Sequence, residues 1–245
     1  MNFLKNLPGR LLAGWAILMF VVTMLIFILP IWLVVLIPEP RRTRAFRQIT
    51  NAWMRVFFFL VGLRMKISGR KNFQRGANYI IISNHNSMMD IPLTTPFIPG
   101  GNKTIAKAEM SRIPLFGMIY KRGSVLVDRK SEESRKNSYL AMKQVLEQGL
   151  HMCIYPEGTR NRTAEPLQPF HNGAFRLSVE TGKAILPAVI FNTAKVLPAG
   201  KGFYFWPVQV RMEFLPPVEP GSMTADELKT KLFTIVREYY LANQN

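Results

Sequence analysis

A histidine and an aspartate, at positions 85 and 90, are the side chains whose types and spacing could do chemistry. His85 and Asp90 bound the run His-Asn-Ser-Met-Met-Asp, which follows the apolar, strand-like run Tyr79–Ser83. A neutral imidazole can take a proton from a hydroxyl group, and a nearby carboxylate can hold the ring in the right tautomer and stabilise the imidazolium that forms. No serine or cysteine stands in a recognisable nucleophile motif. The pair therefore indicates direct activation of a substrate alcohol.

A second block, Tyr-Pro-Glu-Gly-Thr-Arg at positions 155–160, ends another strand-like run. Arg160 can meet a phosphate with two parallel hydrogen bonds, and Thr159 and the local amides can add donors. Glu157 can accept a hydrogen bond from a hydroxyl group, and Gly158 allows a tight turn. The block suits a small polyol phosphate, although a capped surface loop would have the same composition. Each block alone is a weak pattern, and the two together favour a substrate site beside a base.

Strand-like and helix-like runs alternate after residue 64, which is typical of an α/β domain with a largely parallel sheet. Strands are expected at Met65–Ser68, Tyr79–Ser83, Lys103–Ala108, Val125–Asp128, Met152–Tyr155, Ile185–Ile190 and Phe203–Phe214. Helices are expected at Met88–Pro96, Ser131–Glu147, Gly173–Thr181 and Thr224–Ala242. Ligand groups collect at the carboxyl ends of strands in such sheets. Four useful side chains stand at or just past such ends, so we expect them to meet at one edge: His85, Lys107, Arg129 and Glu157.

The N-terminal part contains an apolar run, Leu11–Ile37, of 27 residues without a charge. A straight helix of that length would measure roughly 40 Å, against about 30 Å of bilayer hydrocarbon. The run can therefore cross a membrane with a tilt, or break at Pro30 and turn back. A signal peptide is disfavoured because the run is too long and no small-x-small cleavage site follows. We expect the run to be embedded in a membrane.

The charges that flank this run predict its orientation. Lys5 and Arg10 precede it, and five arginines follow it, at positions 41, 42, 44, 47 and 55. This bias places the C-terminal side in the cytoplasm, so we expect a protein of the inner, cytoplasmic membrane with its catalytic domain on the cytoplasmic side. A shorter apolar patch, Val56–Leu63, is expected either as an interfacial helix anchored by Trp53 or as a buried helix of the soluble domain. The predicted division is residues 1–63 for the membrane part and 64–245 for the catalytic domain.

The composition limits the partners and the metal chemistry. The formal net charge of +17 attracts anions such as nucleic acid, anionic lipid headgroups or an acidic carrier protein. The one cysteine, Cys153, excludes an intramolecular disulfide and a cysteine-rich metal site. It is expected to be a small core thiol rather than an acyl-carrying nucleophile. The three histidines are scattered, at positions 85, 151 and 171, so no metal site is expected.

Four blocks, taken in order, resemble the glycerolipid acyltransferase family. They are the runs around 84–90, 107–129, 155–160 and 185–190, and the resemblance covers roughly residues 67–190. It implies an α/β domain of mixed, largely parallel sheet flanked by helices, with an N-terminal membrane-embedded helical segment. It also implies that His85 is the general base and Asp90 its orienting carboxylate. The acceptor-binding residues that it implies are Lys107, Arg129, Glu157, Gly158, Thr159 and Arg160.

The implied reaction moves a fatty acyl group from acyl-CoA or acyl-ACP to the free hydroxyl of 1-acyl-sn-glycerol 3-phosphate, giving phosphatidic acid for phospholipid biosynthesis. No covalent acyl-enzyme, cofactor or metal is required. The same transfer to a lyso-aminolipid or to glycerol 3-phosphate is the close alternative. A non-catalytic lipid-binding protein and a membrane-anchored nucleic-acid-binding protein are two further alternatives. The nucleic-acid alternative leaves the 156–160 block unexplained, so no nucleic-acid partner is expected.

The chain departs from the family pattern in two places. Tyr155 stands where phenylalanine is usual, which is a mild change. His171 or Asn172 stands where a lysine is frequent, so a cation near the site is missing. His171 could replace it in part when protonated, but we expect a loop histidine, and His151 is expected to be structural.

Overall fold

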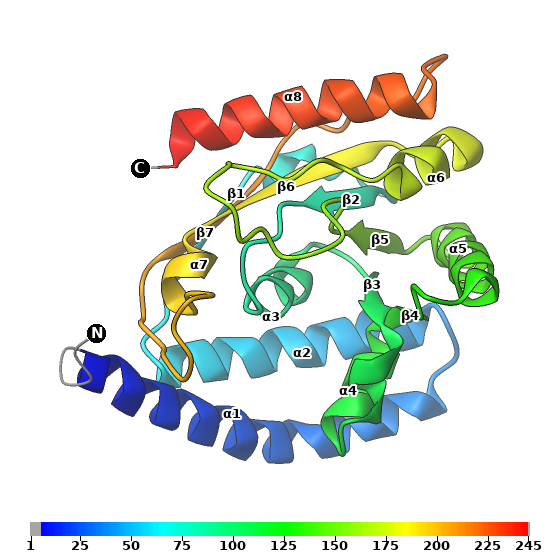
Figure 1. The fold of residues 1–245 in the computed structure, drawn as a ribbon. Coiled ribbons are helices and arrows are strands. Elements are labelled where there is room, and N and C mark those ends of the chain that lie inside the picture. The colour runs from blue at the N-terminus through cyan, green and yellow to red at the C-terminus, as the bar shows by residue number, and fades with distance from the viewer. Residues whose placement is uncertain (1–5, 245) are drawn as a thin grey trace.

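A seven-stranded sheet forms the centre of the molecule, and the structure, a computed structural model, describes residues 6–244 (Figure 1). The strands are β1 (Met65–Ser68), β2 (Ile80–Ser83), β3 (Asn102–Lys107), β4 (Ser124–Val127), β5 (His151–Ile154), β6 (Ile185–Phe191) and β7 (Val210–Phe214). Their order is β1-β7-β6-β2-β5-β3-β4, and every neighbouring pair is parallel except β6 and β7. The expected α/β class with a mixed, largely parallel sheet is confirmed.

Helices cover both faces of the sheet (Figure 1). They are α1 (Leu7–Leu33), α2 (Arg41–Leu60), α3 (Asp90–Thr94), α4 (Phe116–Arg122), α5 (Glu132–Glu147), α6 (Gly173–Thr181), α7 (Thr193–Val196) and α8 (Ala225–Asn243). One core cluster joins α5, α6 and α8 to one face of the sheet, and a second joins α1, α2 and α3 to the other. Adjacent residues of β2 alternate between them, since Ile81 belongs to the second and Ile80 to the first.

Two expected elements are shorter than the sequence suggested. The helix expected at Met88–Pro96 is α3 followed by a 3-10 turn at Thr95–Phe97. The strand expected at Phe203–Phe214 begins only at Val210, where β7 starts. Before that point the backbone N–H groups of Phe205 and Trp206 donate to the carbonyls of Gly9 and Val196, so they cannot join the ladder. Helices α4 and α7 were not expected from the sequence.

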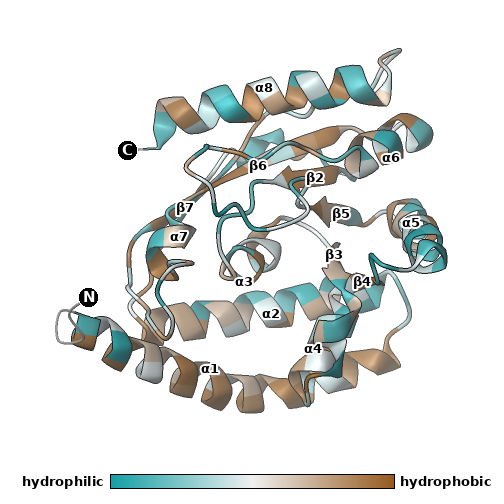
Figure 2. Ribbon diagram, in the orientation of Figure 1, coloured by the Kyte–Doolittle hydropathy of each residue, from teal (hydrophilic) through white to brown (hydrophobic). Residues whose placement is uncertain are grey.

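The N-terminal helix α1 is apolar over most of its length (Figure 2). Together with the following turn it forms a helical run, Leu7–Leu36, that is long and apolar enough to cross a membrane by length and composition. The helix continues through Pro30 to Leu33, so it does not break at the proline. Large apolar side chains along it are exposed, including Leu18, Leu25, Ile26 and Trp32. This exposed face indicates association with a membrane.

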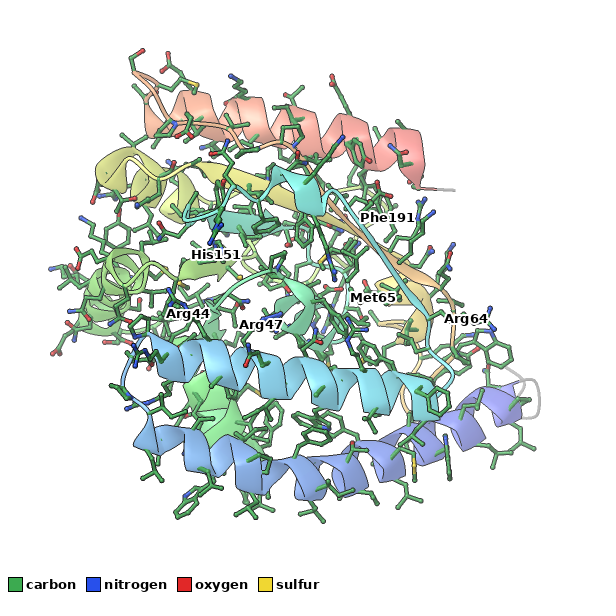
Figure 3. The ribbon with its side chains drawn as sticks, turned by 180° about the vertical axis from the view of Figure 1, so that it is seen from behind. Arg44, Arg47, Arg64, Met65, His151 and Phe191 are labelled. Carbon is green, nitrogen blue, oxygen red and sulfur yellow. The ribbon has the colours of Figure 1, made fainter. Side chains whose placement is uncertain are left out.

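Helix α2 turns back beside α1 and lies between α1 and the sheet (Figures 1 and 3). The anchor role expected for Trp53 is wrong, because this side chain is 3% exposed. Its indole N–H donates to the Thr23 hydroxyl at 2.9 Å, and its ring packs against Phe20 of α1. Phe59, on the opposite side of α2, is 83% exposed. The buried-helix interpretation therefore holds for one face of α2, while the other face is open.

Candidate active site

His85 and Asp90 are in direct contact at the carboxyl end of the central strand β2. The distance from His85 Nδ1 to Asp90 Oδ2 is 2.7 Å. Asp90 begins α3 and its side chain is 0% exposed. The same oxygen accepts the backbone N–H groups of Asn86 and Ser87, at 2.7 and 2.8 Å. A carboxylate held by two amides favours the tautomer with the proton on Nδ1, which leaves Nε2 of His85 as an acceptor.

The loop that carries the histidine is fixed from two further sides. Asn84 forms a reciprocal pair with Ile190 of β6, donating to its carbonyl at 2.9 Å and accepting its N–H at 2.7 Å. The ring of Tyr155 lies 4.5 Å from the imidazole, centroid to centroid. The Tyr155 hydroxyl is hydrogen-bonded to the Thr94 hydroxyl at 2.8 Å. Burial raises the pKa of Tyr155 well above its usual value, so the phenol stays neutral. The imidazole therefore has a rigid, mostly uncharged wall behind it.

Glu157 connects the two sequence blocks. Its Oε1 accepts the backbone N–H of His85 at 2.7 Å, and its Oε2 accepts the N–H of Gln168 at 2.9 Å. The Asn161 N–H donates to the His85 carbonyl at 2.6 Å, so the turn 157–161 is tied to both sides of the His85 backbone. Burial raises the pKa of Glu157. Each carboxylate oxygen accepts one backbone N–H, so Glu157 braces the two loops against each other.

Within this turn, Gly158 is in contact with Arg129 and His171. Gly158 has φ +72°, which favours glycine, and an Arg129 Nη1 N–H donates to its carbonyl. A Cβ placed on Gly158 would lie 2.7 Å from Cδ2 of His171. The structure thus brings together a guanidinium, an imidazole edge and the turn. The position of His171 against Gly158 was missed; its one sequence signal was the lysine that is frequent at His171 or Asn172.

The remaining predicted site residues have no direct hydrogen bond to the His85 loop among the described contacts. The Thr159 hydroxyl donates to Oε1 of Gln168 at 3.3 Å, and Nε2 of Gln168 donates to the Arg160 carbonyl at 3.4 Å. Lys107 ends β3 and is exposed. Burial raises the pKa of Tyr120, which lies near the Lys107 backbone and near the charges of Glu109 and Arg129. Gln168, which braces the whole turn, carried no signal in the sequence.

His151 and Cys153 are structural, as expected. His151 Nδ1 accepts the Tyr79 N–H at 3.0 Å, and burial lowers its pKa to about 4. Cys153 is buried, and burial raises its pKa to about 12, which leaves an unreactive thiol. Arg47 points from α2 toward the sheet near His151 (Figure 3), and burial lowers the pKa of Arg47 to about 9.

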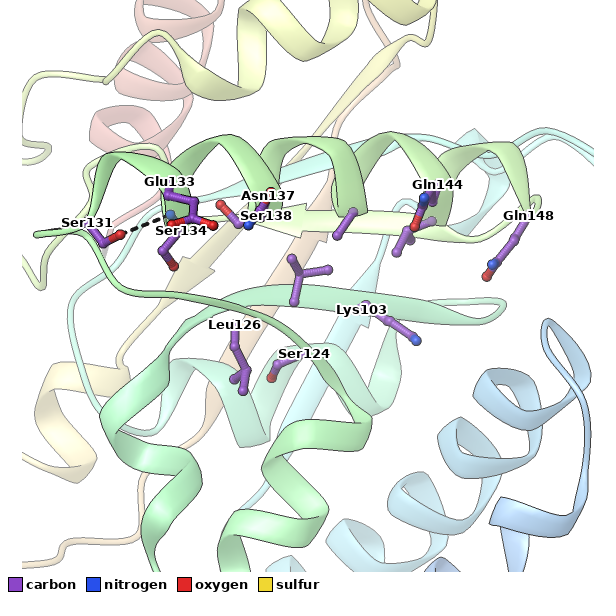
Figure 4. A pocket seen from close by; sticks show the side chains of 13 residues that line it. Lys103, Ser124, Leu126, Ser131, Glu133, Ser134, Asn137, Ser138, Gln144 and Gln148 are labelled. Atoms are coloured by element: carbon purple, nitrogen blue, oxygen red, sulfur yellow. Dashed lines mark hydrogen bonds between the residues drawn. The ribbon is translucent and has the colours of Figure 1, made fainter.

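A groove of about 560 Å³ lies away from these residues, between the edge strand β4 and α5 (Figure 4). Its lining is mostly polar, including Ser124, Ser134, Asn137 and Gln144. None of the residues that contact His85 lines it. We therefore locate the candidate active site by its hydrogen-bonded groups and not by this groove.

A buried carboxylate, an oriented imidazole and a turn beside Arg129 meet at the carboxyl edge of an α/β sheet, an arrangement that is able to remove the proton of a hydroxyl group. The chain belongs to the Acyltransferase family, whose model matches residues 64–191.

Named relatives support the same family. Human 1-acyl-sn-glycerol-3-phosphate acyltransferase alpha is 29% identical over 189 residues, covering 74% of this chain and 66% of the relative. The Helicobacter pylori 1-acyl-sn-glycerol-3-phosphate acyltransferase is 33% identical over 141 residues, covering 57% of this chain and 58% of the relative. The matched region thus spans less than two thirds of the length of these curated relatives. The crystal structure of the Thermotoga maritima 1-acyl-sn-glycerophosphate acyltransferase PlsC has a TM-score of 0.81, 20% identity and 98% coverage of both chains, which confirms the fold.

Proposed function

We propose that this protein transfers a fatty acyl group from an acyl thioester to the free hydroxyl of 1-acyl-sn-glycerol 3-phosphate, forming phosphatidic acid. The observation that carries the proposal is the hydrogen-bonded link between the His85–Asp90 pair and the turn 157–161. It joins a base to a turn flanked by cations, as an alcohol that carries a phosphate requires. The relatives named above are acyltransferases for this acceptor.

In the proposed reaction, Nε2 of His85 removes the hydroxyl proton while the oxygen attacks the thioester carbonyl. A C–O bond forms, and the carbonyl electrons move onto the oxygen to give a tetrahedral oxyanion. When this intermediate collapses, the C–S bond breaks and His85 returns the proton to the departing thiolate. Asp90 stabilises the transient imidazolium, and general-base help of this kind contributes roughly 10²–10⁴-fold.

The backbone amides that can stabilise the oxyanion are found by setting aside those that already donate to another group of the protein. The N–H groups of His85, Asn86 and Ser87 donate to the carboxylates of Glu157 and Asp90. The Gly158 N–H donates to the Tyr155 carbonyl. These bonds direct us to the next amides of the turn, at positions 159 and 160, as the groups that stabilise the oxyanion.

We assign the acceptor phosphate to Arg129, Arg160 and Lys107, with Thr159 as a further donor. Arginine suits this part because its planar fork can bind two phosphate oxygens at once. Gly158 supplies the turn, and Glu157 acts as a positioning residue through His85 and Gln168. For the acyl donor, acyl-CoA and acyl carrier protein are both polyanionic, so the +17 charge suits either.

We further propose that α1 lies along one leaflet of the cytoplasmic membrane instead of crossing it. Helix α2 runs beside α1 and carries Arg41, Arg42, Arg44 and Arg55. A perpendicular α1 would draw these charges into hydrocarbon, which is costly. The bias of arginines after α1, against Arg10 before it, favours the cytoplasmic side. Lys5 belongs to the same bias and lies outside the described residues.

The direct test is acyl transfer by the purified full chain in liposomes, with a matrix of acyl thioesters and acceptors. We expect phosphatidic acid from 1-acyl-sn-glycerol 3-phosphate, and loss of nearly all turnover in His85→Ala. Lys136→Ala, an exposed residue of α5, is the control that keeps full turnover. Undiminished transfer in His85→Ala would end the mechanism. Faster transfer to a lyso-aminolipid or glycerol 3-phosphate would show that one of these is the preferred acceptor. Acceptor binding without any transfer would show that the protein binds lipid and is not an acyltransferase.

A further inference from the structure

The turn between β3 and α4 has a strained backbone at an apolar residue. Leu115 has φ +59° and ψ −56°, in the left-handed half of conformational space that leucine rarely occupies. The Phe116 N–H donates to the Pro114 carbonyl at 2.6 Å, which closes a three-residue γ-turn. The Gly117 N–H donates to the Ile113 carbonyl at 2.7 Å. The tip is therefore held in a costly conformation by its own short hydrogen bonds.

The same tip exposes apolar side chains. Leu115 is 52% exposed and Ile113 is 43% exposed. Gly117 packs closely on the base of the tip, since a Cβ at this position would lie 2.2 Å from the Ser111 carbonyl oxygen. This turn has two costs in water, the backbone strain at Leu115 and the exposure of its apolar side chain. Contact with an apolar partner removes the second cost.

The tip continues the apolar face of α1. Phe116, the next residue, lies 6.5 Å from Phe20 of α1, centroid to centroid. Helix α4 extends down to α1 in Figure 1, and the exposed apolar residues of α1 include Leu18 and Leu25. Arg112 directly precedes the tip and is exposed, and Lys121 is exposed in the last turn of α4. Apolar residues with flanking cations are the complement of hydrocarbon beneath anionic headgroups.

We propose that the Ile113–Leu115 tip inserts into the same leaflet as α1, as a second and independent lipid contact. The inference rests on the membrane association proposed above. Tyr120 of α4 lies against the Lys107 backbone and near Arg129. Insertion of the tip therefore also brings the end of β3 and Arg129 toward the leaflet surface, where the phosphate of a lipid acceptor lies.

The test measures the depth of single nitroxide labels on the full chain in vesicles of phosphatidylcholine and phosphatidylglycerol. Labels are placed by Leu115→Cys at the tip, Leu18→Cys on α1 and Leu140→Cys on α5. Leu140 is the matched control, because it is 57% exposed on a helix far from α1 (Figure 1). The native Cys153 is buried and does not compete for the label. Collisions with lipid-soluble oxygen and with a water-soluble nickel chelate report where each label lies.

We expect the oxygen-to-nickel accessibility ratio to exceed unity at positions 18 and 115 and to fall below unity at position 140. A lipid-like ratio at 18 with a water-like ratio at 115 overturns the inference and leaves the membrane association of α1 intact. Water-like ratios at both positions overturn both proposals. Protection of position 115 that arises only when acyl carrier protein is added would show a protein contact instead, and also overturns the lipid assignment. Acyl transfer in detergent tests the site chemistry separately.

Discussion

Asp90 receives three hydrogen bonds on one oxygen, and this convergence sets the state of the histidine. The donors are Nδ1 of His85 and the amides of Asn86 and Ser87. Since the two amides can only donate, this oxygen acts as an acceptor, and the third bond then has Nδ1 of His85 as its donor. The proton-accepting nitrogen is thus Nε2 before any substrate arrives.

Replacing the carboxylate by an amide tests this orientation. We expect Asp90→Asn to lower kcat by roughly 10²–10⁴-fold, because an asparagine can present N–H where His85 needs an acceptor. The KM for the lipid acceptor should change little, since Asp90 is fully buried and acts through His85. Steady-state kinetics in mixed micelles measure both constants. A rise in KM alone would place Asp90 in acceptor binding.

Gly158 is the residue whose replacement tests the phosphate site. Alanine there must adopt φ +72° and meet His171 at 2.7 Å, so the turn or the imidazole has to shift. We expect Gly158→Ala to raise the acceptor KM by roughly tenfold, or about 1.4 kcal/mol of binding. Gly173→Ala is the control, because its Cβ would meet nothing within 4 Å. Equal KM values in the two variants would contradict the assignment.

At the scale of elements, α1 and α2 are joined by a buried polar bond as well as by apolar packing. Trp53 of α2 donates to the Thr23 hydroxyl, and Thr23 also donates to the Met19 carbonyl of its own helix at 2.7 Å. A buried indole N–H needs such a partner. The bond therefore fixes the register of the two helices and, through α2, the position of α1 on the domain.

Removing one partner of this bond should cost more than removing both. We expect Thr23→Val to lower the free energy of unfolding by about 1–3 kcal/mol, because the Trp53 N–H stays buried without an acceptor. Adding Trp53→Phe should recover part of that loss. Thermal unfolding in detergent measures the stability of the wild-type protein, of each single variant and of the double variant. Additive losses in the double variant would show that the bond contributes nothing of its own.

The whole molecule is layered, with α5, α6 and α8 on one face of the sheet, α2 and α3 on the other, and α1 outermost (Figure 1). His151 lies inside this assembly, where burial lowers its pKa to about 4. A histidine that resists protonation in the folded state contributes stability above the unfolded pKa of about 6.5, and that stability is lost as the pH falls.

The pH dependence of global stability tests this buried histidine. Between about pH 6.5 and pH 4 the unfolded chain binds a proton at His151 and the folded chain does not, so unfolding is favoured by roughly 3 kcal/mol at the lower pH. His151→Asn, which can still accept the Tyr79 N–H, should flatten this part of the profile. Melting temperatures across the range give the result. Identical slopes in both proteins would refute the contribution of His151.

Contacts that are local, or that repeat with a fixed period, can be predicted from the amino-acid sequence of this protein. His85 and Asp90 are close in the chain, so a short helix start is enough to join them. Parallel strands also bring their carboxyl ends to one edge whatever their order. For this reason Glu157 and Arg129 lie beside the His85 loop as expected. Lys107 ends β3 at the same edge, and its place beside the loop stays a prediction.

Contacts between positions that are distant in the chain become visible only when the helices and strands are packed together. The brace from Glu157 to the His85 amide, the contact of His171 with Gly158 and the burial of Trp53 each join segments whose relative placement no local pattern encodes. An exposed glutamate and a bracing glutamate have the same sequence signature, and so do an interfacial and a buried tryptophan. Which one forms depends on packing across the sheet and between helices, because burial is a property of the neighbours that surround a side chain and not of the side chain itself.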